Sequence, residues 1–354
     1  MNLKIQCLRD KLKAQNMQGM IVSNPVNVKY LTGLDDEGTL LITLKENVFL
    51  TDGRYIENVQ KKLTIADEII AYDIGKLSKY DYENFFIMLE NIGFEEKYVT
   101  YETYKNYLTR YQVNLVETEG IIEKLRTIKE QEEIESISKA CKITDDCFKY
   151  IQTWIKRGMT EKEIAFEMEC YMRTHGADGL AFDTIVASGH NSSLPHAVPT
   201  DRRIREGDII LFDFGCRVNG YCSDMSRTIF VSFVDEEYKK DYDFVLGVQE
   251  KMIEEIRDGA NIKLVVKNAE NEFKMNNYEI MHSFGHGVGL DIHEIPYITS
   301  KFDNKYKENN IVTVEPGIYI PGRYGIRIED TVLVKKDKAE RLTLSSKDYI
   351  IIKG

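Results

Sequence analysis

The chain has 354 residues and a formal net charge of −11, with 43% hydrophobic and 30% charged residues. This length favours two domains over one core, and the acidic balance argues against nucleic acid or an anionic membrane as partner. No apolar run reaches the ~18 residues of a membrane span. Six scattered cysteines without a Cys-x-x-Cys pair, and an N-terminus without a secretory signal, favour a cytoplasmic protein with reduced thiols.

The first part of the chain alternates between helix and strand patterns. Residues 1–19 are predicted to form an amphipathic helix, and Met20–Ser23 a strand. Two further apolar segments, Leu40–Thr43 and Asn47–Thr51, flank a polar turn. The pattern predicts a small α/β domain over residues 1–125.

A longer second domain, residues 126–354, begins with helices. A charge-dense stretch over residues 129–156 carries apolar residues close to one helical face. Thr160 and Glu163 form a capping-box pattern at the start of the next helix. Two more helices are expected near residues 236–258 and 262–276, within a part of the chain that is otherwise rich in strands.

An acidic hairpin is predicted in this second domain. Asp208–Gly215 is an apolar strand, and Asn219-Gly220 is a strong turn signal, because both residues tolerate positive φ. Counting back from that turn sets Gly215 opposite Asp224, with Asp213 diagonal to Asp224 at about 7–8 Å. Two acids on one buried face need a cation, and glycine opposite Asp224 leaves room for a metal. The alternative is a buried acid satisfied by backbone amides.

A second candidate hairpin pairs Ile311–Glu315 with Ile326–Val334 across a turn at Pro321-Gly322. Strand alternation puts Arg327 and Glu329 on one face. Taken alone, this pair is also typical of a surface ion pair on an edge strand.

Histidines gather in segments rich in glycine or proline. His286 lies between two glycines, where an ion can approach closely, and His282 and His293 flank it. His196 lies in a separate segment that contains two prolines. Gly285-x-Gly287-x-Gly289 faintly resembles a dinucleotide loop, but the spacing is wrong and no helix-opening pattern follows. A serine nucleophile elbow and a His-Glu-x-x-His zinc site are absent.

Together these motifs resemble the pita-bread metallopeptidases, the superfamily of methionine aminopeptidase, aminopeptidase P, prolidase and the metal-free creatinases. The likeness covers residues 126–354 as the catalytic domain. It extends to residues 1–125 as a creatinase-like N-terminal domain, in which Leu50–Tyr55 is typical. The resemblance implies an α/β chain with an α+β catalytic domain of the pita-bread fold.

The resemblance also assigns roles to single residues. The metal ligands that it implies are Asp213, Asp224, His286, Glu315 and Glu329. The catalytic residues that it implies are His196, His293 and Glu315, and the residues that bind substrate or orient ligands are Phe182, His282 and Arg327. In this hypothesis His293 stabilises the developing oxyanion, and Glu315 carries a proton to the leaving proline nitrogen.

Two divalent metal ions per subunit are the expected cofactors, because four carboxylates would balance their charge. Oxygen-rich ligands favour Mn²⁺, with Co²⁺ or Zn²⁺ as alternatives. Such a metal pair lowers the pKa of a water molecule that attacks the scissile carbonyl.

The predicted activity is hydrolysis of the Xaa-Pro bond, either at the N-terminus of short peptides (an Xaa-Pro aminopeptidase) or in dipeptides (prolidase). Arg323 is a candidate for reading the C-terminal carboxylate of a dipeptide. A homodimer is implied by the resemblance. The alternatives are an exopeptidase of the methionine aminopeptidase type and a non-catalytic binding protein on the same fold.

Overall fold

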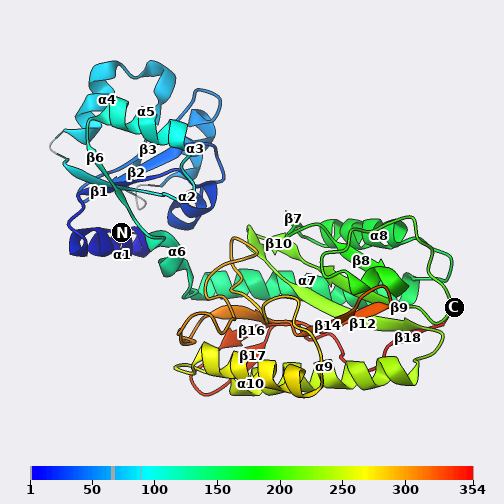
Figure 1. The fold of residues 1–354 in the computed structure, drawn as a ribbon. Helices are drawn as coiled ribbons and strands as arrows, with labels where there is room; N and C mark the ends of the chain where they lie inside the picture. The colour runs from blue at the N-terminus through cyan, green and yellow to red at the C-terminus, as the bar shows by residue number, and fades with distance from the viewer. Residues whose placement is uncertain (1, 65–67, 88, 354) are drawn as a thin grey trace. The chain divides into compact units, whose positions relative to one another are not determined.

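The computed structural model describes residues 2–64, 68–87 and 89–353 (Figure 1). The chain divides into two compact units, Met1–Arg126 and Thr127–Gly354, next to the boundary expected from the sequence. Within the described residues, no helix is long and apolar enough to cross a membrane.

The first unit is built on a mixed six-stranded sheet with the order β4-β3-β2-β1-β5-β6. Its strands are β1 Gly19–Val22, β2 Thr39–Thr43, β3 Asn47–Thr51, β4 Ile69–Asp73, β5 Asn91–Phe94 and β6 Asn114–Glu117. Its helices are α1 Leu3–Ala14, α2 Pro25–Thr32, α3 Ile56–Lys62, α4 Lys79–Phe86, α5 Tyr101–Tyr111 and α6 Ile121–Arg126, with the 3₁₀ turn η2 Ile74–Lys76. Strand β2 is antiparallel to β1 and β3, and the other neighbouring strands are parallel.

The predicted elements of this unit are present, with one shorter than expected. The first helix ends at Ala14, because Asn16 adopts a φ of 58° and the chain then turns into β1. Asn24, which follows β1, is the N-cap of α2, because its side chain accepts a hydrogen bond from Val26 N. Helices α4 and α5 pack Tyr82 and Tyr107 against one face of the sheet.

The second unit combines four helices with several small sheets in the residues that the structure describes. Its helices are α7 Gln131–Trp154, α8 Glu161–Thr174, α9 Glu236–Glu255 and α10 Ile262–Met275, with the 3₁₀ turn η3 Gly189–Ser193. Its first strands are β7 Gly179–Leu180, β8 Ile185–Ser188, β9 Ile209–Phe214, β10 Cys216–Val218, β11 Tyr221–Cys222 and β12 Met225–Val231. Its remaining strands are β13 Ile311–Val314, β14 Gly317–Ile320, β15 Tyr324–Arg327, β16 Asp330–Val334, β17 Ala339–Arg341 and β18 Ile351–Ile352.

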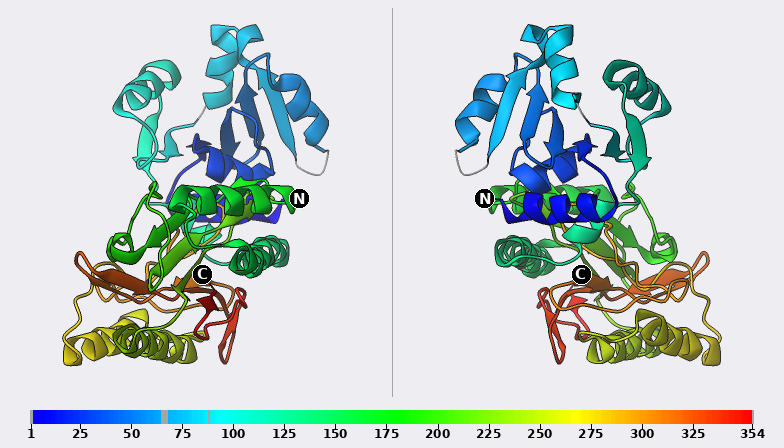
Figure 2. Two further views of the ribbon diagram at one scale, coloured as in Figure 1. Left: turned by 90° about the vertical axis from the view of Figure 1, so that its right-hand side faces the viewer. Right: turned by 90° about the vertical axis from the view of Figure 1, so that its left-hand side faces the viewer.

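These strands lie between two pairs of helices, as Figures 1 and 2 show. The sheets have the orders β18-β12-β9-β8, β11-β10-β7, β13-β16-β17 and β14-β15. On one side, Phe148 of α7 packs with Phe212 of β9. On the other side, Phe273 of α10 packs with Ile326 and Ile328. The α/β fold class predicted from the sequence is confirmed. Strand β9, which carries Asp213, contributes residues to both cores, and β15, which carries Arg327, contributes to the second.

The capping box predicted at the second helix is also present. Thr160 Oγ1 accepts a hydrogen bond from Glu163 N at 3.1 Å, and the Glu163 carboxylate accepts one from Thr160 N at 2.6 Å. These bonds satisfy backbone amides that have no partner within the helix, and they fix the start of α8.

Candidate metal centre

The first acidic hairpin has the register that the turn residues predict. Asn219 and Gly220 adopt φ values of 53° and 82°, and Val218 pairs with Tyr221 across the turn. Further along, Asp213 pairs with Ser226 of β12, which continues the same count.

The predicted reason for the glycine in this hairpin was wrong. A Cβ on Gly215 would lie 1.9 Å from the Ser223 carbonyl oxygen and 3.3 Å from Phe182. The space opposite Asp224 is therefore filled by the hairpin's own backbone and an aromatic ring. Glycine is required there because the two strands approach closely, and the cavity lies on another side of Asp224.

The second predicted hairpin has the predicted pairing, but its ladder is interrupted in both strands. Strand β13 pairs with β16, whereas β14 and β15 form a separate hairpin across the turn at residues 321–323. Pro316 has no N–H to continue a ladder, so β13 ends and Glu315 lies beyond it. At the second break, Glu329 N donates to Ser226 O of β12 at 3.1 Å. Arg327 and Glu329 are only 3% and 1% exposed, so the surface ion pair is excluded.

These breaks open a cavity of about 540 Å³ at the ends of the strands. Its lining includes all the candidate metal ligands, catalytic residues and orienting residues of the sequence: Phe182, His196, Asp213, Asp224, His282, His286, His293, Glu315, Arg327 and Glu329. The structure thus brings together side chains from four distant parts of the second unit. Their individual roles remain predictions.

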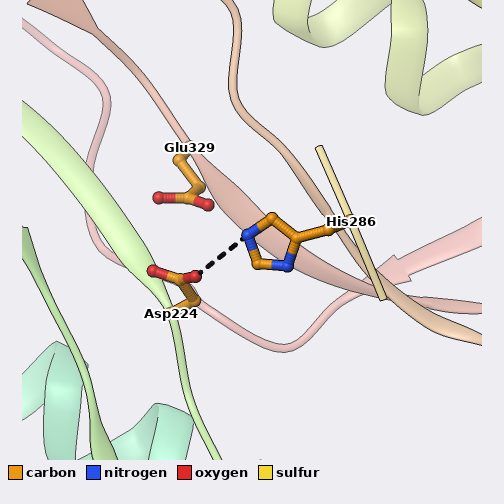
Figure 3. A group of neighbouring side chains, drawn as sticks. All are labelled: Asp224, His286 and Glu329. Carbon is orange, nitrogen blue, oxygen red and sulfur yellow. Dashed lines mark ion pairs between the residues drawn. The ribbon is translucent and has the colours of Figure 1, made fainter. Parts of the chain in front are cut away.

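Three of these residues form a compact group of possible ligands, shown in Figure 3. Asp224, His286 and Glu329 each offer one ligand atom, and these atoms lie within 4.8 Å of one another. His286 Nε2 is 3.5 Å from both Asp224 Oδ2 and Glu315 Oε1. His286 Nδ1 is 3.1 Å from Gly287 O, so a proton on Nδ1 would leave Nε2 free to bind a cation.

The charges in this group are not balanced by the protein. Burial and the neighbouring Glu329 raise the pKa of Asp224 well above its usual range, and burial with Glu315 does the same for Glu329. Burial raises the pKa of Glu315 to about 8 and lowers that of His286 to about 4. Asp213 Oδ1 is buried and finds no hydrogen-bond partner among the described residues. Such a donor set fits divalent cations, which would supply the missing positive charge.

Arg327 holds two of the acids, Asp213 and Glu329, through hydrogen bonds. Its Nη2 lies 2.6 Å from Asp213 Oδ2, and its Nε donates to Ser226 Oγ at 2.7 Å. Ser226 Oγ in turn donates to Glu329 Oε2 at 2.8 Å. One guanidinium therefore orients two predicted ligands, which only its planar fork permits.

His282 belongs to the same hydrogen-bonded group through a residue that the sequence did not reveal. Tyr319 OH lies 2.9 Å from His282 Nε2 and 2.5 Å from Arg327 Nη1. Burial, with Arg327 nearby, lowers the pKa of His282 to about 4 and keeps it neutral. No local signal marked Tyr319, whereas Ser226 could have been found because it alternates with Asp224 on the same strand face.

The remaining candidates lie at the open side of the cavity. His293 and His196 are exposed, and the His293 ring packs edge-on to His286 with centroids 4.3 Å apart. A bridge between Gly287 and Glu294 closes the loop that joins these two histidines. Arg323 lies outside this cavity, on an exposed turn, where its guanidinium binds Glu237 at 2.6 and 2.9 Å.

A buried group of acids around one imidazole, on this α/β scaffold, defines a metal-dependent hydrolase. Residues 135–336 match the model of metallopeptidase family M24, and residues 4–128 match the creatinase/prolidase N-terminal domain. The chain belongs to metallopeptidase family M24. The resemblance, the pita-bread fold and the enzyme class predicted from the sequence are confirmed, and use of a divalent metal follows from the family.

Several relatives are similar over nearly their whole length. The chain is 35% identical to an Xaa-Pro dipeptidase from Pyrococcus furiosus, covering 99% of this chain and 100% of the relative. It superposes on an Xaa-Pro dipeptidase from Bacillus anthracis with a TM-score of 0.93, at 34% identity and with 98% and 99% of the two chains covered. It also superposes on an X-Pro aminopeptidase from Thermotoga maritima with a TM-score of 0.87, at 30% identity and with 96% and 98% covered.

Proposed function

We propose that this chain hydrolyses the peptide bond between an N-terminal residue and a following proline. The observation that carries the proposal is the cavity in which Asp224, His286 and Glu329 converge beside Asp213 and Glu315. The substrate class is supported by relatives named Xaa-Pro dipeptidase and X-Pro aminopeptidase. None of the relatives named above favours a methionine-specific enzyme or a non-catalytic binding protein.

The same proposal includes two divalent metal ions, of which Mn²⁺ is the first choice because oxygen ligands predominate. The residues that would hold them are Asp213, Asp224, His286, Glu315 and Glu329. When bound, the metals would lower the pKa of a water molecule and polarise the scissile carbonyl.

The chain's own residues would contribute the remaining steps. His293 is exposed to the cavity beside His286, and burial keeps its pKa below the usual value, so a neutral ring can donate a hydrogen bond to the developing oxyanion. Glu315 would carry a proton to the leaving proline nitrogen. Phe182 and His196 would form the wall against the proline ring, and His282 with Arg327 would orient the ligands. A cytoplasmic location and a homodimer remain predictions from the sequence.

Whether the enzyme prefers dipeptides or longer peptides depends on how it treats the C-terminal carboxylate. Among the described residues that line the cavity, Arg327 is the one arginine or lysine, and its fork is already bound to Asp213 and Ser226. Among the described residues that line the cavity, His196 and His293 are exposed imidazoles that could meet a dipeptide's carboxylate.

The deciding experiment compares an Xaa-Pro dipeptide with the same unit extended at its C-terminus, using Mn²⁺-loaded protein. Faster cleavage of the dipeptide would indicate a prolidase, and faster cleavage of the longer peptide an Xaa-Pro aminopeptidase. The proposal fails if neither is cleaved while the protein binds metal and remains folded.

A second test separates ligand residues from other acids of the cavity. Asp224→Asn should lower activity by about 10³-fold or more, because the metal loses a charged ligand, and should reduce the metal bound per chain. Asp183→Asn removes the same charge from the same cavity outside the compact group of possible ligands and should leave metal content unchanged. Metal analysis of both variants measures the difference, and equal metal content would contradict the assignment.

A further inference from the structure

The loop over residues 189–199 carries one wall of the cavity. It leaves β8 at Ser188 as η3, and it returns to the start of α8 at Thr200. Pro195 and His196, near its tip, line the cavity. The position of this loop therefore determines where that wall lies.

Both ends of the loop are held by one carboxylate. Glu161, the first residue of α8, is 0% exposed. Its Oε1 accepts hydrogen bonds from Ser188 N and Oγ, both at 2.7 Å. Its Oε2 accepts from Thr200 N at 2.9 Å and from Thr200 Oγ1 at 2.7 Å. Asn191 Nδ2 lies 3.1 Å from both carboxylate oxygens.

The buried charge of Glu161 is compensated mainly by these bonds. Among the described residues, no lysine or arginine forms an ion pair with Glu161. Arg202 approaches it indirectly, because its Nη1 donates to Ser188 Oγ at 2.6 Å while the guanidinium pairs with Asp208. The start of α8 adds backbone dipoles that favour a carboxylate. Since a buried charge is tolerated only when its hydrogen bonds are made, the carboxylate and the loop ends stabilise each other.

The loop between these ends has further anchors of its own. Gly325 N donates to Ser192 Oγ at 2.9 Å, and Arg327 Nη1 lies 3.3 Å from Pro195 O. The flanking side chains of Leu194 and Val198 are 58% and 77% exposed. Ser192 and Ala197 are buried, so packing holds part of the loop, and the clamped ends hold it where it leaves β8 and returns to α8.

We propose that Glu161 is a positioning residue for substrate recognition, which acts by clamping the loop that presents Pro195 and His196. The inference rests on the proposed function, in which this wall receives the proline side of the peptide. Because Glu161 does not line the cavity, its loss should weaken substrate binding more than it slows the chemical step.

The test uses Glu161→Gln and a matched control on the same helical turn, Glu163→Gln. In the first variant an amide group faces hydroxyl and backbone donors that need an acceptor. The control removes the same charge from the same helix start, but Glu163 is exposed and bonds to Thr160 rather than to the loop.

For Glu161→Gln we expect KM for an Xaa-Pro peptide to rise about ten-fold, with kcat changed by less than about three-fold. Hydrogen exchange of residues 189–199 should become about ten-fold faster in the same variant. Glu163→Gln should change neither quantity. Unchanged KM in Glu161→Gln, or equal effects in both variants, would overturn the proposal.

If Glu161→Gln does not fold, Thr200→Val carries the test, because it removes one hydroxyl of the clamp with little change in shape. It should raise KM and loop exchange in the same direction, and a normal KM would count against the clamp. Hydrogen exchange is measured without substrate, so it does not depend on the proposed activity. If the wild-type protein cleaves no Xaa-Pro peptide, the proposed function is refuted. Exchange of residues 189–199 that is faster in Glu161→Gln than in Glu163→Gln would still support the clamp.

Discussion

At the scale of single residues, Arg327 shows why side-chain shape matters as much as charge. Its guanidinium reaches Asp213, Tyr319 and Ser226 in three directions at 2.5–2.7 Å. A lysine would keep the positive charge but could not hold this fork geometry. The arginine therefore fixes the orientation of groups that themselves face the cavity.

Arg327→Lys should lower kcat/KM by about 10- to 100-fold and weaken metal affinity, because Asp213 and Glu329 lose their common support. Steady-state kinetics and metal titration measure the two effects. Arg323→Lys is the matched control, since Arg323 binds Glu237 on an exposed turn. Equal losses in both variants would show that the orientation of the acids is not what Arg327 provides.

At the scale of elements, the sequence predicted well what depends on neighbours in the chain. The turn at Asn219-Gly220 fixes a hairpin register by backbone conformation alone, and the capping box at Thr160 fixes the start of a helix. The two breaks in the second hairpin could not be predicted this way, because they depend on where its strands leave their ladders. Pro316 was a visible signal for one of those breaks, whereas the bond from Glu329 N to Ser226 O was not.

The same distinction holds within the site. The candidate residues could be named from motifs and family resemblance, and the cavity contains them all except Arg323. Tyr319 and Glu161 could not be named, because their roles arise from contacts with segments far away in the sequence. Tyr319 reaches His282, and Glu161 reaches Ser188 and Thr200. Such contacts carry no periodic or local signature.

The hairpin that holds Asp224 gives a prediction at this scale. Gly215→Ala should lower the stability of the protein by roughly 3 kcal/mol, because the new methyl group collides with the Ser223 carbonyl. Thermal unfolding measures the loss, and metal binding should weaken because the residue next to Ser223 is Asp224. Gly179→Ala on β7 is the control, since no atom lies within 4 Å of its new Cβ. A stable Gly215→Ala variant would mean that the strands can separate without cost.

At the scale of the whole molecule, ionisation of the buried acids at the cavity lowers the stability of the folded protein when no cation is bound. An acid whose pKa is raised by folding contributes stability that is present below its ordinary pKa and is lost as the pH rises through the folded value. For Glu315 these two pKa values are 4.5 and about 8. His282 and His286 have the opposite effect, because folding lowers their pKa values from 6.5 to about 4. They therefore reduce stability as the pH falls below 6.5.

The metal-free protein should therefore gain thermal stability as the pH falls from about 8 to about 6.5, and should gain little more below that. Calorimetry of protein treated with a chelator measures this trend. Saturating Mn²⁺ should remove it, and Glu315→Gln should reduce it in the metal-free form. A metal-free protein whose unfolding temperature is constant over this range would contradict the charge imbalance.

The strand pairings of the second unit have a consequence for the protein during its synthesis. The cavity collects side chains from Asp213 through Glu329, and Ile351–Ile352 completes the sheet beside β12. A ribosome-bound chain that has not yet exposed its last acid lacks part of the proposed centre. The nascent chain should therefore be inactive toward other emerging N-termini until Glu329 has left the ribosome.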